Sequence, residues 1–358
     1  MSWTSQRAEE YLARLEPIGW RFGLERMRRL VSLLGMPQHR FASVHVVGTN
    51  GKSSVTAVTA ALLEAHGMRA GAYLSPHTSR WTERITIGGQ EIGAADLALA
   101  LERVAQSATA LERALEPGDR VTQYEAVTAA AFVALAAARV DVAVIEAGLG
   151  GRLDATNVLP SRVTVLSSVG LEHTELLGET EEQIAAEKLA VLRGHSTLVV
   201  GRLSPSVREL ARRRAGELSA RFVDVRELSS AVELSSAAPY LRRDFAVSLA
   251  AAETILGRLE PERVMEVAAG LELPGRMELL DGDPPTLIDA AHNPAGAAAL
   301  AEALPEVIGE RPVIACLAIL PGKDAAGIVT ALAPRLDGLV ATRVPAAAMS
   351  GLGRPGAS

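Results

Sequence analysis

A glycine-rich segment that ends in a lysine and two serines contains the residue types that bind nucleotide phosphates. Its residues are Gly48, Thr49, Asn50, Gly51, Lys52, Ser53 and Ser54. Glycines allow a tight turn whose N–H groups point inward, and a lysine beside them can reach the outer phosphates of a nucleotide. The strict pattern G-x-x-x-x-G-K-[ST] requires glycine at position 46, where this chain has Val46. The segment therefore indicates a nucleotide site, and the alternative is an ordinary strand-to-helix turn.

Three further polar residues lie near the C-terminal ends of predicted strands: Glu146 is close to the end of one apolar run, and Ser75 and His173 come after two others. The carboxyl ends of parallel strands meet at one edge of a sheet, so we expect these residues and Lys52 to face one crevice. Serine and glutamate oxygens suit Mg²⁺, and a histidine nitrogen is a less usual but feasible ligand. Each residue alone also fits a structural role, although an acid at the end of a buried strand needs a partner. Together they predict a metal site.

Lys188 follows several glutamates on a predicted helix, where a surface ion pair is the ordinary interpretation. A second polar cluster appears later in the chain, formed by Asp289, His292 and Asn293. Asp289 is suited to position a substrate ammonium group or a nucleotide, whereas Asn293 before a proline is also a usual start of a helix. Arg276 is suited to bind a phosphate or a carboxylate with its guanidinium group, or is an ordinary surface arginine.

The elements that position these residues alternate between strand and helix, which predicts an α/β fold with a doubly wound, mostly parallel sheet. Pro274 and Gly275 interrupt this pattern, so we predict one domain over 1–273 and a smaller α/β domain over 274–358, with a disordered tail at 351–358. The segment 81–89 predicts a short hairpin or an ordered loop. The main predicted strands are 44–47, 70–74, 140–147, 163–169, 286–290, 313–320 and 338–344, and the main helices are 55–67, 94–115, 124–139, 179–192, 237–256 and 295–304.

Composition argues against several classes of partner. The net charge of −6 and the low aromatic content of 3% disfavour binding to nucleic acid or to an anionic membrane. The longest uncharged apolar run, 126–138, is too short to span a bilayer, and the N-terminus has no apolar signal region. We therefore expect a cytoplasmic protein. The single cysteine, Cys316, lies in an apolar run and is predicted to pack in the core.

The motifs together resemble the folylpolyglutamate synthase and dihydrofolate synthase family of the Mur ligase superfamily. The resemblance extends over 11–344 and rests on the segments HVVGTNGKSS, YLSPH, ERITIGG, EAGLGGRLDATN, GLEHTELLGET, AAEK, LPGR and DAAHNP. It implies a Mur ligase-like ATP-binding domain with a P-loop and a smaller Rossmann-like C-terminal domain. It also implies an ATP-dependent ligase that joins L-glutamate to the carboxylate of a folate or dihydropteroate through an acyl phosphate.

The resemblance assigns roles to individual residues. Lys52 and the loop amides would hold the phosphates of ATP, and Ser75, Glu146, His173 and Lys188 would serve Mg²⁺ at two sites. Family members carry a carbamylated lysine at the position of Lys188, where a carbamate offers oxygens and negative charge to a metal. Arg276, Asp289, His292 and Asn293 would complete the ATP and glutamate sites when the two domains close. A monovalent cation and a monomeric state are further implied expectations.

Three departures from the family are visible. Ser53 stands where the family usually has glycine, and Asp244 stands where the family has an asparagine that contacts the nucleotide. The chain also stops soon after 344, which predicts a truncated C-terminal domain. Two alternatives therefore stay open, namely a catalytically impaired nucleotide-binding remnant and a Mur-type amide ligase that acts on another carboxylate. The sequence does not separate dihydrofolate synthase from folylpolyglutamate synthase.

Overall fold

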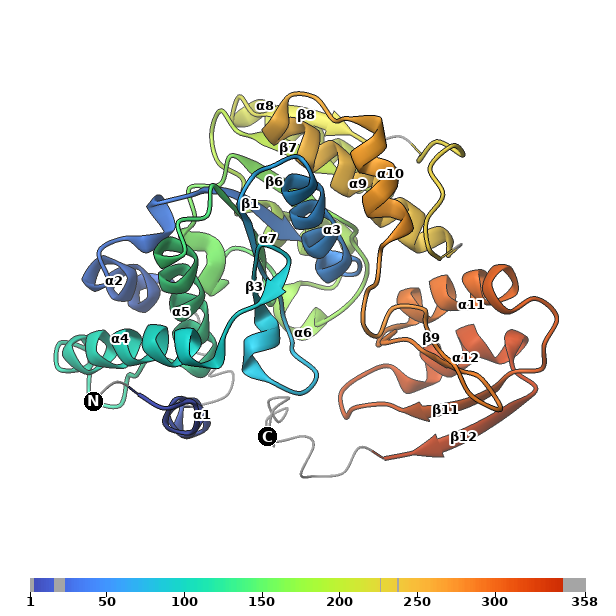
Figure 1. Cartoon of the computed structure of the whole chain (residues 1–358), viewed down its shortest axis with the longest axis horizontal. Helices are drawn as coiled ribbons and strands as arrows, with labels where there is room; N and C mark the ends of the chain where they lie inside the picture. The colour runs from blue at the N-terminus through green and yellow to red at the C-terminus, as the bar shows by residue number, and fades with distance from the viewer. Residues whose placement is uncertain (1–2, 16–22, 226, 237, 344–358) are drawn as a thin grey trace. The chain divides into compact units, whose positions relative to one another are not determined.

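The computed structural model describes residues 3–15, 23–225, 227–236 and 238–343, and the predicted tail at 351–358 lies outside them. The chain divides into two compact units (Figure 1). The first unit comprises residues up to Val225 together with Val247–Glu260, and the second comprises Arg226–Ala246 and the residues from Pro261 onward. Helix α9, Pro239–Leu256, therefore contributes its first part to the second unit and its last part to the first. Our division into 1–273 and 274–358 stays a proposal.

An eight-stranded sheet forms the centre of the first unit, with the order β4-β3-β2-β5-β1-β6-β7-β8. Strands β2, β5, β1, β6, β7 and β8 are parallel, while β3 and β4 join one edge as an antiparallel hairpin. The mostly parallel sheet confirms the predicted fold class. The strands are β1 Ala42–Val47, β2 Ala70–Tyr73, β3 Ile85–Ile87, β4 Gln90–Glu91, β5 Val142–Glu146, β6 Val163–Leu166, β7 Thr197–Val200 and β8 Arg221–Asp224.

Apolar residues explain why these strands are central, because a parallel sheet is covered on both faces and its strands become apolar throughout. All five residues of β5 are buried. Besides the last part of α9, the helices of this unit are α1 Ser5–Arg14, α2 Glu25–Leu33, α3 Lys52–Ala65, α4 Ala94–Glu112, α5 Gln123–Ala137, α6 Thr174–Leu177, α7 Glu181–Leu189 and α8 Pro205–Glu217. The alanine-rich helix α5 is buried from Glu125 to Leu135 and begins with a capping box between Thr122 and Glu125. The helix predicted over 124–139 is therefore present and forms part of the core.

The hairpin predicted near residues 81–89 is present. A short 3₁₀ helix, Trp81–Arg84, leads into β3, and β4 follows after Gly88 and Gly89. Both glycines have positive φ angles, 60° and 70°, which a two-residue hairpin turn of this kind requires.

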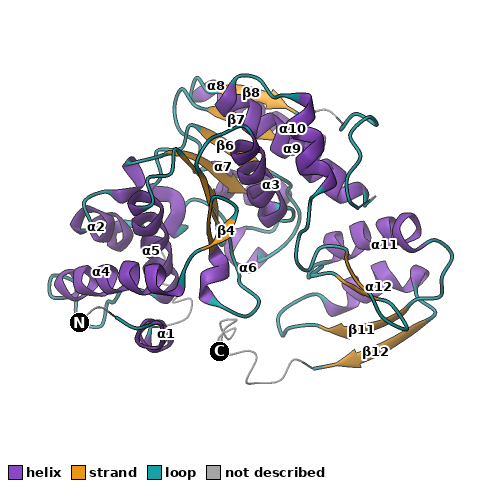
Figure 2. Cartoon of the chain, in the orientation of Figure 1, coloured by secondary structure: helices purple, strands orange, loops and turns teal. Residues whose placement is uncertain are grey.

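The second unit contains two small sheets. Strands β9 Glu278–Leu280 and β10 Thr286–Ile288 are antiparallel, whereas β11 Ile314–Ala318 and β12 Gly338–Thr342 are parallel. The helices are α10 Pro261–Ala269, α11 Pro294–Ile308 and α12 Ala325–Leu332, and Figure 2 shows β11 and β12 side by side along α11 and α12.

One face of the β11–β12 sheet packs on helices, and the other is exposed. Leu317 packs with Ile328 and Leu332 of α12. Ile314 and Val340, in contrast, are 75% and 53% exposed, and Cys316 is also exposed. The prediction that Cys316 packs in the core is therefore wrong, because its apolar strand is covered on one face only.

Candidate active site

The glycine-rich segment connects β1 to α3 as predicted. Gly51 precedes the first helical residue, Lys52, and has a φ of 81°. Gly48 has no room for a side chain, because a Cβ there would lie 1.9 Å from Ser167 Oγ. Lys52 Nζ donates to the carbonyl oxygens of Gly48 and Thr49, at 3.1 Å each. The segment is thus a closed turn at a helix N-terminus, the geometry that suits an anion.

Glu146 is the point at which three elements of the first unit meet. It is the last residue of β5 and only 1% exposed. Its Oε2 accepts from the backbone N–H of Ser75 after β2, and its Oε1 accepts from Ser53 Oγ at the start of α3, both at 3.0 Å. The predicted convergence of Ser75, Glu146 and the lysine segment is therefore present in the structure.

Lys188 joins the same region from helix α7. Its side chain is buried, and Nζ donates to the carbonyl oxygen of Gly48 at 2.7 Å, the same oxygen that Lys52 contacts. Burial, followed by repulsion from Lys52, lowers the pKa of Lys188 to about 7. Burial excludes the interpretation of this residue as a surface ion pair. At neutral pH, much of this lysine is an uncharged amine, which is the nucleophilic form.

A second glycine-rich loop, 148–151, holds Lys188 in place. A Cβ on Gly151 would lie 2.7 Å from the carbonyl oxygens of both Glu187 and Lys188. The N–H of Arg152 donates to the Glu187 carbonyl, and the Arg152 side chain forms an ion pair with Glu187, both at 3.0 Å. The absence of a side chain at Gly151 therefore allows the loop to pack directly on α7.

His173 precedes α6, in a left-handed conformation with a φ of 51°. Its ring nitrogens lie 3.8 Å from a Glu172 oxygen and 3.7 Å from a Glu175 oxygen. Among the residues that the structure describes, no group of three or more His, Cys, Asp and Glu side chains is arranged to hold a metal ion.

The later polar cluster lies in the second unit. Asp289 Oδ2 accepts from the Tyr240 hydroxyl at 2.7 Å and from the N–H of Met277 at 3.1 Å. Burial and the nearby Asp289 raise the pKa of Tyr240. Asn293 caps α11 by accepting from Gly296 N–H at 2.8 Å, so its helix-starting role is present. His292 is exposed, with Nδ1 3.1 Å from the carbonyl oxygen of Ala290.

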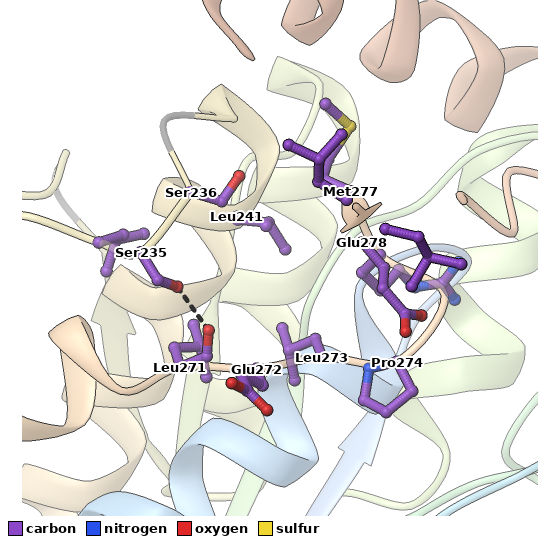
Figure 3. A pocket seen from close by; sticks show the side chains of 13 residues that line it. Ser235, Ser236, Leu241, Leu271, Glu272, Leu273, Pro274, Met277 and Glu278 are labelled. Carbon is purple, nitrogen blue, oxygen red and sulfur yellow. Dashed lines mark hydrogen bonds between the residues drawn. The ribbon is translucent and has the colours of Figure 1, made fainter. Parts of the chain in front are cut away.

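Arg276 lines a cavity of about 380 Å³ within the second unit. Figure 3 shows leucines on its walls, among them Leu241, Leu271 and Leu273, with the Ser235 hydroxyl bonded to the Leu271 carbonyl. The walls combine aliphatic side chains with three charged residues, the cation Arg276 and the acids Glu272 and Glu278.

The sequence analysis did not predict a buried network of hydrogen bonds that contacts the second glycine-rich loop. Asp154 accepts from the N–H of Leu149 at 2.9 Å and from both the N–H and the hydroxyl of Thr156. The Thr156 oxygen lies 2.7 Å from His45 Nε2, and the Tyr124 hydroxyl donates to Asp154 at 3.4 Å. The segment GLGGRLDATN contains Asp154, but its spacing alone gives no sign of the contact with His45, more than a hundred residues earlier.

Comparison with known proteins decides the family. The Mur ligase middle domain matches residues 46–231, and the Mur ligase glutamate ligase domain matches residues 275–353. A dihydrofolate synthase/folylpolyglutamate synthase of Mycobacterium tuberculosis is 33% identical over 89% of this chain and 74% of its own length. The chain belongs to the folylpolyglutamate synthase/dihydrofolate synthase family. The resemblance seen in the motifs is therefore confirmed.

Solved structures of this family have the same fold. The Mycobacterium tuberculosis folylpolyglutamate synthase complexed with ADP has a TM-score of 0.87 at 31% identity, and the match covers 95% of this chain and 82% of that one. A folylpolyglutamate synthase in complex with AMPPCP and folate has a TM-score of 0.88 at 28% identity, over 96% and 90% of the two chains. Like its family, the chain is an ATP-dependent glutamate ligase.

Proposed function

We propose that this chain joins L-glutamate to the carboxylate of a folate or dihydropteroate through an acyl phosphate. The glycine-rich segment and Glu146 form the centre of the proposed active site. The observation that carries the proposal is the convergence of Lys52, Lys188 and Glu146 around one turn. This arrangement combines a phosphate cradle with a buried carboxylate. Phosphoryl transfer depends mainly on such positioning and charge neutralisation.

The reaction has two steps. The substrate carboxylate attacks the terminal phosphorus of ATP, which gives the acyl phosphate and ADP. The neutral α-amine of glutamate then attacks the acyl carbon, the C–O bond to phosphate breaks, and the amine loses a proton as the amide forms. In both steps the N–H groups at the start of α3 and the ammonium of Lys52 would hold phosphate oxygens.

The residues present fit Mg²⁺. Glu146 is a buried carboxylate whose two oxygens face Ser53 and Ser75, and a buried acid of this kind gains from a nearby cation. We propose that Glu146, the Ser75 hydroxyl and His173 hold the ion. When bound, Mg²⁺ neutralises phosphate charge.

Lys188 suits the carbamate that the family resemblance implies. Carbamylation joins the nitrogen of an uncharged amine to the carbon of CO₂ and releases one proton. The lowered pKa of Lys188, about 7, supplies the uncharged amine at neutral pH. The product replaces a second ammonium beside Lys52 with an anion, which removes a like-charge contact and offers oxygens to a metal.

For the second unit we propose that Asp289 and His292 position glutamate, while Arg276 and Asn293 contact the nucleotide. Asp289 has a fixed orientation because Tyr240 and two backbone N–H groups donate to it. A carboxylate oriented in this way is suited to bind an ammonium group. We also propose that the protein is a monomer and that it acts in the cytoplasm. Within the described residues, no helix is long and apolar enough to cross a membrane.

The test is phosphate release from ATP by the purified protein, together with mass spectrometry of the folate product. We expect release that requires both glutamate and folate or dihydropteroate, and a product heavier by one glutamate residue. Lys52→Ala should abolish turnover, whereas Arg29→Ala, a change at a half-buried residue of α2 whose side chain bonds to the Ala114 carbonyl, should not. Nucleotide binding without turnover would instead support an impaired remnant, and turnover only with other acids would support a different Mur-type ligase.

A further inference from the structure

Ser53 replaces the glycine that the family usually carries at this position, and so adds a hydroxyl group to the glycine-rich segment. It follows Lys52 directly, in the first turn of α3. In the strict P-loop pattern, the residue after the lysine is serine or threonine, and its hydroxyl binds Mg²⁺. The sequence alone leaves open whether this hydroxyl faces the site or solvent.

The structure places the hydroxyl against the acid of the proposed metal site. Ser53 is half-buried, and its Oγ donates to Glu146 Oε1 at 3.0 Å. The other oxygen of that carboxylate accepts from Ser75 N–H, also at 3.0 Å. A hydroxyl has one proton and two lone pairs, so donation to Glu146 leaves the lone pairs of Ser53 available. Two serines therefore flank the two oxygens of one buried carboxylate.

We propose that the Ser53 hydroxyl is an additional oxygen ligand of the Mg²⁺ ion in this chain. The proposal rests on the proposed function, because the ion belongs to the nucleotide site described above. Small hard cations take oxygen ligands, and a neutral hydroxyl beside a carboxylate adds a ligand without adding charge. The competing interpretation is that Ser53 only orients Glu146 through its hydrogen bond.

The first experiment measures Mn²⁺ binding in the presence of ADP, without folate or glutamate, by electron paramagnetic resonance. We expect Ser53→Ala to weaken Mn²⁺ binding roughly ten-fold, the size of effect seen when support for a metal site is removed. Ser53→Thr, which keeps the hydroxyl, should stay within about three-fold of the wild type by the same reasoning. Ser32→Ala is the matched control, because that exposed serine bonds only within its own helix region. Melting temperatures establish that each variant is folded.

A second experiment separates ligation from orientation. Ser53→Cys is made in a Cys316→Ser background, so that position 53 carries the only thiol. Thiolates favour soft ions. If position 53 ligates the metal, this variant should bind Cd²⁺ more tightly than Mn²⁺ and show an ultraviolet thiolate-to-cadmium band. If Ser53 only orients Glu146, neither change should appear, and the proposal is overturned.

The remaining outcomes also decide the question. Wild-type affinity for Mn²⁺ in Ser53→Ala overturns the role of Ser53 while leaving the metal site intact. A wild type that binds no Mn²⁺ with ADP overturns both proposals. A wild type that binds Mn²⁺ in a Ser53-dependent way but lacks ligase activity supports the role of Ser53 and contradicts the proposed function.

Discussion

Acid should destabilise this protein through His45, a residue of β1 that plays no part in the proposed chemistry. His45 is fully buried, and its Nε2 lies 2.7 Å from the Thr156 hydroxyl oxygen. The Thr156 hydroxyl donates its own proton to Asp154, so it must accept from His45, which places the imidazole proton on Nε2. The other ring nitrogen, Nδ1, is buried without a hydrogen-bond partner. A second proton would have to enter at that position.

The size of the effect follows from the pKa of His45. Burial, with a smaller contribution from Arg193, lowers this pKa from 6.5 to about 3. Below pH 6.5 the unfolded chain therefore binds a proton that the folded protein excludes, and the free energy of unfolding falls as pH falls toward 3. Above pH 6.5 the contribution is constant. Because one pKa unit corresponds to about 1.4 kcal/mol, the loss between pH 7 and pH 5 should be about 2 kcal/mol.

Urea denaturation at pH 7 and pH 5 measures this loss. Other groups titrate over the same range, so the informative quantity is the difference between the wild type and His45→Gln, which keeps an N–H donor for Thr156 but does not titrate. We expect the pH-dependent loss to be smaller in the variant by about 2 kcal/mol. The wild type also allows a direct measurement, because hydrogen–deuterium exchange at the imidazole ring, followed by mass spectrometry, reports the pKa of each histidine.

Two results would refute this reasoning. One is an equal loss of stability with acid in the wild type and the variant. The other is a His45 pKa near 6.5 in the folded protein, which can be measured even if His45→Gln does not fold.

Three further predictions concern the site. Lys188→Ala should reduce turnover on the order of 100-fold while the protein stays folded, and added acetate or formate should restore part of it in steady-state assays. Gly151→Ala should cost roughly 1–3 kcal/mol in urea denaturation, because its Cβ would meet two backbone oxygens that cannot swing aside. The control Gly216→Ala, with open space at its Cβ, should be neutral or slightly stabilising. Tyr240→Phe should raise KM for glutamate about five-fold, the equivalent of one hydrogen bond to Asp289, and an unchanged KM would contradict that role.

Much of the site could be predicted because it lies at strand ends. An apolar run identifies each strand, and the geometry of a parallel sheet then brings the residues after the strands to one edge. Ser75, Glu146 and the segment around Lys52 were predicted in this way, and their contacts are present. The hairpin β3–β4 is also expected from its turn glycines, but its place beside β2 at the edge of the sheet depends on a strand pairing that periodicity does not encode.

The remainder depends on contacts that no local pattern records. Lys188 has acidic neighbours in sequence, yet its amine contacts Gly48, 140 residues away. Tyr240 and Asp289 are separated by 49 residues and belong to different elements. For Cys316, the apolar run identified the strand correctly but could not show that only one of its faces is covered.

The division of α9 between the two units has a consequence for synthesis on the ribosome. The last part of this helix supplies Val247, Ala251 and Ala252 to the buried interior of the first unit, and Ser248 Oγ donates to the Val55 carbonyl at 3.3 Å. The N-terminus of a nascent chain leaves the ribosome first. The first unit therefore cannot complete its core until residue 260 has emerged from the ribosome. By then 226–246 has already emerged, ahead of the residues with which it packs. During translation, segment 226–246 is therefore synthesised before the residues of the second unit with which it packs. In the same interval the first unit completes its core with 247–260, the segment that follows.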